Sequence, residues 1–129
     1  MNFFKNIFGS DETPKQQEFK INWENLTDLN QLAEIMFNSN EKPAVIFKHS
    51  TRCSISRMAL KQFENEFALQ DKVTPYFLDL LNYREISNEI ANRFQVEHQS
   101  PQILVIKDGK SVYDASHSDI DASVLAEVV

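Results

Sequence analysis

The stretch of sequence that most constrains the fold runs from residue 43 to residue 69. Residues 43–49 form a near-continuous apolar run rich in β-forming side chains, which is typical of a central strand covered on both faces. Residues 57–69 carry apolar side chains three and four positions apart, which predicts a helix. Cys53, the only cysteine of the chain, lies between them. We therefore expect a buried strand that leads through a short loop into a helix, with the thiol where the helix begins.

The rest of the chain repeats this alternation. Further strands are predicted at residues 19–23, 73–80, 102–107 and 111–113, and further helices at residues 29–40, 86–94 and 118–128. Asp108-Gly109 predicts a hairpin turn between the last two strands, and Ser118 with Asp121 resembles a capping box at the start of the last helix. Because alternating strands and helices favour βαβ crossovers, the predicted fold class is α/β: a mixed central sheet of about five strands with helices on both faces.

The beginning of the chain differs from the remainder. Residues 10–17 are polar and include Pro14, so we expect residues 1–17 to be an apolar segment followed by a linker, and residues 18–129 to be one domain. Four apolar side chains near the start would share one face of a short helix: Phe3, Phe4, Ile7 and Phe8. That face could pack on the domain, touch a membrane surface or bind a partner, and a frayed end is the plainer alternative.

Composition excludes several classes of function. The net charge of −6 argues against nucleic acid as a partner, and no apolar stretch is long enough to predict a membrane span. The chain shows no set of cysteine, histidine and carboxylate residues with metal-ligand spacing, and its two glycines form no phosphate-binding loop. A single cysteine cannot form an internal disulfide, which favours a cytoplasmic protein.

The expected position of Cys53 suits a reactive thiol. Free N–H groups and the helix dipole stabilise negative charge at a helix start, and the thiolate is the nucleophilic form of cysteine. Ser56 stands where a redox dithiol would have its second cysteine, so the predicted chemistry is exchange through one thiol. The alternative for a lone cysteine is a small buried hydrophobic residue without a chemical role.

Two segments give this chain a family resemblance. The sequence Ser-Thr-Arg-Cys-Ser-Ile-Ser around Cys53, and Ser100-Pro101 immediately before a predicted strand, resemble the thioredoxin-like fold and, within it, the YtxJ-like monothiol bacilliredoxins. The resemblance covers residues 18–129. It implies a catalytic Cys53 opposite a cis Pro101, and a substrate-binding surface made by the neighbouring residues Thr51, Arg52, Ser54, Ser56, Ser100 and Pro101.

The chain departs from these relatives at three positions. Ser54 replaces the proline that usually follows the nucleophile in the family, and Arg52 replaces the tryptophan of ordinary thioredoxins. Phe47 stands where ordinary thioredoxins bury a carboxylate that assists their second thiol. Because Ser56 replaces that thiol, such a carboxylate would have no partner here.

Several of these residues also have simpler interpretations. Ser50 and Thr51 could cap the helix, Arg52 could be an ordinary solvated side chain, and Ser56 could be a first-turn hydroxyl near the sulfur. His49 ends a strand near the thiol, but no Asn or Asp partner is evident, so a cysteine-protease pair is disfavoured. His98 and His117 are expected to be exposed loop residues.

The resemblance implies a monothiol oxidoreductase that removes bacillithiol from mixed disulfides on client proteins. Bacillithiol would be a substrate rather than a tightly bound cofactor, and the region of Ser118 and Asp119 would help to form the ligand groove. One alternative is a non-catalytic thioredoxin-like interaction module. Another is a reductase or peroxidatic enzyme that depends on an external resolving partner.

Overall fold

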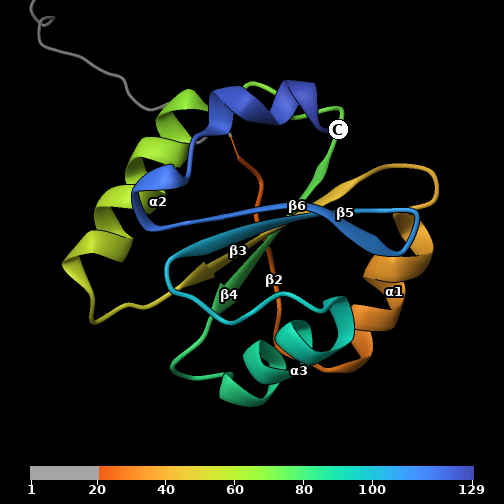
Figure 1. The fold of residues 1–129 in the computed structure, drawn as a ribbon, viewed down its shortest axis with the longest axis horizontal. Helices are drawn as coiled ribbons and strands as arrows, with labels where there is room; N and C mark the ends of the chain where they lie inside the picture. Colours follow the sequence, from red (N-terminus) through yellow and green to blue (C-terminus); the bar gives the residue numbers. More distant parts are fainter. Residues whose placement is uncertain (1–20) are drawn as a thin grey trace, which may run out of the picture.

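The computed structural model describes residues 21–129, which fold around one sheet (Figure 1). The elements follow in the order β2 (Glu24–Asn25), α1 (Asn30–Asn38), β3 (Ala44–His49), α2 (Ser54–Glu66), β4 (Thr74–Asp79), α3 (Arg84–Phe94), β5 (Gln102–Lys107), β6 (Lys110–Ser116) and two 3₁₀ segments, η2 (His117–Asp119) and η3 (Ala122–Glu127).

The sheet has five strands in the order β2-β4-β3-β5-β6. Strands β2, β4 and β3 run parallel, whereas β5 and β6 are antiparallel to their neighbours. Strand β3 lies at the centre and every one of its residues is buried, as its apolar sequence predicts. The predicted α/β class with a mixed five-stranded sheet is therefore confirmed.

The sheet separates two hydrophobic cores (Figure 1). Successive side chains of a strand point to opposite faces, so β3 contributes Ala44 and Ile46 to one core and Val45 and Phe47 to the other. Helices α1 and α3 cover the first core, which is mainly aliphatic. Helix α2 and the C-terminal 3₁₀ segments cover the second, which is rich in aromatic rings. Each fully buried large side chain contributes about 1.5–3 kcal/mol of hydrophobic stabilisation.

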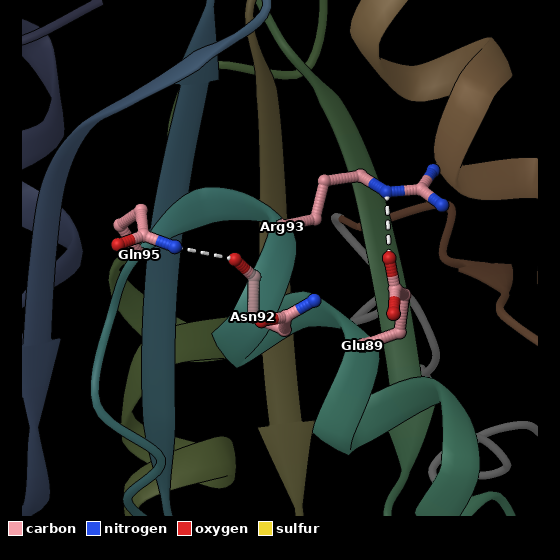
Figure 2. Close-up of polar contacts among 4 residues, drawn as sticks. All are labelled: Glu89, Asn92, Arg93 and Gln95. Carbon is pink, nitrogen blue, oxygen red and sulfur yellow. Dashed lines mark hydrogen bonds and ion pairs between the residues drawn. The ribbon is translucent and has the colours of Figure 1, made fainter.

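Helix α3 ends through local polar contacts (Figure 2). The guanidinium Nε of Arg93 lies 3.0 Å from the Glu89 carboxylate one turn earlier, and the Gln95 side chain donates to the Asn92 carbonyl at 2.7 Å. Gln95 adopts a left-handed conformation (φ 57°), and its N–H bonds the Ala91 carbonyl. The two bonds made by Gln95 satisfy the Asn92 and Ala91 carbonyls, which the last turn leaves free, and the left-handed Gln95 turns the chain toward β5.

The first strand is shorter and later than predicted. The pairing covers only Glu24–Asn25, residues 21–23 are not a strand, and residues 19–20 lie outside the described residues. Ile21 is buried in the aromatic core, and the Trp23 indole N–H donates to Glu64 of α2 at 2.7 Å. Side-chain contacts with α2 and with the sheet, rather than backbone pairing with β4, therefore hold this part of the chain. The predicted segment at residues 1–17 also lies outside the described residues.

The predicted C-terminal helix is wrong in kind. Residues 117–127 form two 3₁₀ segments separated at Ile120, whose backbone is extended and whose side chain is buried. The Ser118 capping box does not form; instead the Asp121 carboxylate accepts the N–H of Ser123 at 2.9 Å and its hydroxyl at 2.6 Å. The extended backbone at Ile120 and Asp121 interrupts the helix, and capping moves to Asp121.

No helix within residues 21–129 has the length and apolar character needed to cross a membrane.

Candidate active site

Cys53 occupies the residue immediately before the first turn of α2. Its backbone is extended (φ −110°, ψ 121°), its N–H donates to Ser50 O at 3.2 Å, and its carbonyl accepts the N–H of Arg57 at 3.1 Å. No side chain caps this helix start, so the alternative interpretation of Ser50 or Thr51 as a cap is wrong. The Cys53 side chain is half-buried. The thiol therefore lies at the positive end of the helix dipole and is partly open to solvent.

The peptide bond between Ser100 and Pro101 is cis, as the family resemblance implies. Pro101 is buried and directly precedes β5, whose first residue, Gln102, pairs with Lys48 of β3. Its carbonyl accepts the N–H of His117 at 3.0 Å. Pro101 thus lies at the end of the sheet where β3 ends, and it is hydrogen-bonded to the first residue of η2.

The other residues predicted to bind substrate have different surroundings. Thr51, Arg52 and Ser54 are exposed on the loop and helix start that carry Cys53. Ser100 is partly buried, and its hydroxyl has no hydrogen-bond partner among the described residues. Thr51, Arg52 and Ser54 follow the end of β3, and Ser100 and Pro101 precede the start of β5, which pairs with that end of β3.

Ser56 departs from the prediction. Its side chain is fully buried, and its hydroxyl lies 2.8 Å from His49 Nδ1 and accepts the N–H of Ser50 at 3.1 Å. The buried hydroxyl bonds the end of β3 and the loop after it, which does not fit the substrate contact expected of Ser56. The position that a second cysteine would occupy is filled by a hydroxyl engaged with its own loop.

His49 is the neighbouring residue whose importance sequence reasoning missed. It is only 5% exposed at the end of β3, and its ring lies 5.4 Å from the Phe77 ring. Burial lowers the pKa of His49; the Asp79 carboxylate acts in the opposite direction, Arg57 reinforces the lowering and Glu64 opposes it. The imidazole is therefore neutral near pH 7, with one nitrogen as donor and the other as acceptor. Its place at the end of a buried strand, before a serine-rich loop, was the signal available in the sequence.

Phe47 occupies the position at which thioredoxins bury a carboxylate. It is fully buried, with its ring centroid 5.5 Å from that of Phe63 and 6.1 Å from that of Trp23. Phe47 is therefore part of a cluster of packed aromatic rings.

An apolar hollow of about 190 Å³ adjoins the site between α2 and η2. Ile55 and Met58 on its α2 side are 59% and 71% exposed, which is unusual for large apolar side chains. The lining is formed by Ile55, Met58, Ala59, Gln62, His117, Ser118 and Ile120. Ser118 lines this hollow, whereas Asp119 is not part of its lining. His117 and His98 are both exposed, as predicted.

Within residues 21–129, no cluster of three or more histidine, cysteine or carboxylate side chains is arranged to hold a metal ion.

Comparisons with solved structures identify the fold. A candidate oxidoreductase with a thioredoxin fold is 29% identical, with a TM-score of 0.73, and the match covers 88% of this chain and 98% of that one. Thioredoxin from Malassezia sympodialis (Mala s 13) is 19% identical, with a TM-score of 0.64 over 89% of this chain and 94% of that one. Thioredoxin from Fasciola hepatica is 20% identical, with a TM-score of 0.59 over 81% and 93%. The chain has a thioredoxin fold.

The sequence of the domain identifies its family. Residues 24–125 match the family described as "Monothiol bacilliredoxin BrxC", a range that contains both Cys53 and Pro101. The chain therefore belongs to the monothiol bacilliredoxin family and is a thiol-disulfide oxidoreductase.

Proposed function

We propose that this protein removes bacillithiol from mixed disulfides on client proteins, with Cys53 as the nucleophile. The observation that carries the proposal is a half-buried lone thiol at the start of α2, with a buried serine in place of a second cysteine. Pro101 precedes the start of β5, which pairs with the end of β3 that leads to Cys53, and this placement supports the proposal. Family membership supports a low-molecular-weight thiol as the partner.

The proposed reaction has two exchanges. The Cys53 thiolate attacks the bacillithiol sulfur of the capped client, which forms a disulfide between Cys53 and bacillithiol and breaks the client disulfide. The client leaves as a thiolate and takes a proton from solvent. A second bacillithiol, as thiolate, then attacks the bacillithiol sulfur bound to Cys53. This step releases the Cys53 thiolate together with the disulfide of two bacillithiol molecules. Cys53 is the leaving group of this second step.

The surroundings of Cys53 suggest how the two partners are held. In the proposal the backbone at Pro101 orients the disulfide, and the exposed Arg52 attracts anionic groups of the capped substrate. Thr51, Ser54 and Ser100 supply further polar contacts. The hollow between α2 and η2 accepts an apolar side chain of the client, because exposed Ile55 and Met58 lie beside it. We place the reaction in the cytoplasm and within a domain spanning residues 18–129.

Mass spectrometry tests this proposal directly. Reduced protein is mixed with a client carrying one bacillithiol, and both products are weighed with time. We expect the client to lose the cap while Cys53 gains it, and added bacillithiol to restore free Cys53. The Cys53→Ser variant should leave the client capped. A wild-type protein that binds the client but leaves both masses unchanged would refute the proposal and favour the interaction module.

A further inference from the structure

Ser56 and His49 form a buried polar pair between the first turn of α2, which follows Cys53, and the end of β3. Ser56 Oγ lies 2.8 Å from His49 Nδ1, and the N–H of Ser50 donates to the same oxygen at 3.1 Å. Ser56 is fully buried and His49 is 5% exposed. The pair therefore joins three parts of the site: the last residue of β3, the loop that follows it, and the first turn of α2.

The chemistry of the two groups fixes the direction of their hydrogen bond. A neutral imidazole has one acceptor nitrogen, and a hydroxyl has one hydrogen and two acceptor sites. The described part of the chain gives the Ser56 hydroxyl hydrogen no acceptor other than Nδ1, so we assign Ser56 as the donor, Nδ1 as the acceptor and the imidazole hydrogen to Nε2. The lowered pKa of His49 keeps the imidazole in this neutral form near pH 7.

The charged groups around His49 come from two elements. Asp79 of β4 lies opposite His49 in the sheet register, and its Oδ1 is buried without a hydrogen-bond partner among the described residues. Arg57 and Glu64 of α2 act on the ring with opposite signs. None of the three is hydrogen-bonded to Nδ1 in the described part of the chain, so Ser56 is its partner.

We propose that His49 and Ser56 are positioning residues for Cys53: their hydrogen bond anchors the first turn of α2 to the end of β3 and fixes the place of the sulfur. This inference rests on the proposed function for its kinetic consequence. Residues three apart on a helix are neighbours, so a shift of Ser56 moves the turn that begins at Cys53. Protonation of His49 replaces the acceptor at Nδ1 by a donor, which reverses this hydrogen bond and leaves the Ser56 hydroxyl hydrogen without its acceptor.

Substitutions test the pair without removing the thiol. Ser56→Ala and His49→Leu each remove the hydrogen bond, and we expect kcat for cap removal to fall about tenfold to 100-fold with KM little changed. His49→Asn keeps an acceptor near the position of Nδ1 and should recover most of the rate. Because asparagine does not titrate, this variant should also lack the acid loss of rate that protonation of His49 causes in the wild type.

A second serine–histidine pair provides the matched control. Ser87 of α3 is also fully buried, and its hydroxyl lies 3.3 Å from His98 Nδ1 on the opposite side of the sheet. Ser87→Ala should keep the wild-type kcat. If Ser56→Ala and Ser87→Ala give the same kcat, or if His49→Asn is as slow as His49→Leu, the proposed positioning role is wrong.

Two further measurements separate this inference from the proposed function. Nitrogen NMR of the wild type should show neutral His49 with hydrogen on Nε2, and Ser56→Ala should change that signature. Alkylation of Cys53 by iodoacetamide reports the placement of the sulfur without any bacillithiol substrate. If the wild type removes no cap, the function fails while these two readouts still test the pair. Hydrogen on Nδ1, or equal alkylation rates in wild type and Ser56→Ala, would overturn the pair itself.

Discussion

Lys48 and His49 are adjacent in β3 but meet two different environments. Both are buried, and the alternation of the strand sends their side chains to opposite faces of the sheet. The Nδ1 atom of His49 lies 2.8 Å from the hydroxyl oxygen of Ser56. The ammonium of Lys48 lies 3.5 Å from the backbone carbonyl of Ser87. One polar residue is thus held by a short, specific contact and the other by a long one.

The difference is also one of charge. Burial lowers the pKa of both side chains, and that of Lys48 falls from 10.5 to about 8. His49 is neutral near pH 7, so its burial has a small electrostatic cost there. Lys48 is still largely charged at that pH, and the described part of the chain gives it no carboxylate within ion-pair distance. We infer that His49, on the α2 face of the sheet, positions the start of α2. Lys48, on the α3 face, is a buried charge that lowers the stability of the fold.

The largest expected change in stability follows from removing the buried charge of Lys48. Lys48→Met should raise the free energy of unfolding at pH 7 by up to about 3 kcal/mol, because each unit of pKa shift corresponds to about 1.4 kcal/mol. The unfolded state holds the lysine proton up to about pH 10.5, whereas the folded state releases it near pH 8. Wild-type stability should therefore rise across that window, and the advantage of the variant should vanish above it.

Urea unfolding at pH 7 and above pH 10.5 measures this difference. The exposed Lys61 on α2 gives a matched control, since Lys61→Met should change stability by less than about 0.5 kcal/mol. A Lys48→Met protein that is less stable than the wild type at pH 7 would show that the ammonium is a net stabilising group.

A smaller effect of pH is expected from His49. Its pKa is below 6.5 in the folded protein, so between that value and 6.5 the unfolded state binds the proton more strongly. The stability contributed by neutral His49 is complete above pH 6.5 and is lost as the pH falls through the folded pKa, with a slope of at most about 1.4 kcal/mol per pH unit. Unfolding of the wild type and His49→Asn across this range should diverge in acid. Parallel curves would contradict the burial cost assigned to the imidazole.

Periodicity predicted the parts of the fold that depend on one element at a time. Strand β5 was predicted at its observed bounds, and β3, β4 and α3 differ from their predicted bounds by a residue or two. The cis peptide bond before Pro101 could be predicted only from the family resemblance, because no local sequence pattern around Ser100 requires it. The position of Cys53 before α2 was predicted because a buried strand and an amphipathic helix flank it.

The remaining features depend on contacts between elements. Ser56 looked like an accessible first-turn hydroxyl, and only the packing of α2 against the end of β3 buries it against His49. The C-terminal sequence satisfied a helical pattern, but the extended backbone at Asp121 and at Ile120, whose side chain is buried, divides it into two 3₁₀ segments. The first strand was misplaced because Ile21 and Trp23 make side-chain contacts with α2 and the sheet rather than backbone pairing with β4. Tertiary packing overrode the local pattern at each of these positions.

The smallest expected effect comes from a charge that is not buried. Arg93 and Glu89 form an ion pair on α3 at 3.0 Å, with both side chains about one-third exposed (Figure 2). Water already solvates these charges, so Arg93→Ala should lower the free energy of unfolding by only about 0.3–0.5 kcal/mol, and salt should reduce the difference. A double-mutant cycle with Glu89→Ala measures the coupling. We attribute the large effect of Lys48→Met on stability to the burial of its charge, so an exposed ion pair should couple weakly. A coupling energy above about 1 kcal/mol between Arg93 and Glu89 would contradict this explanation.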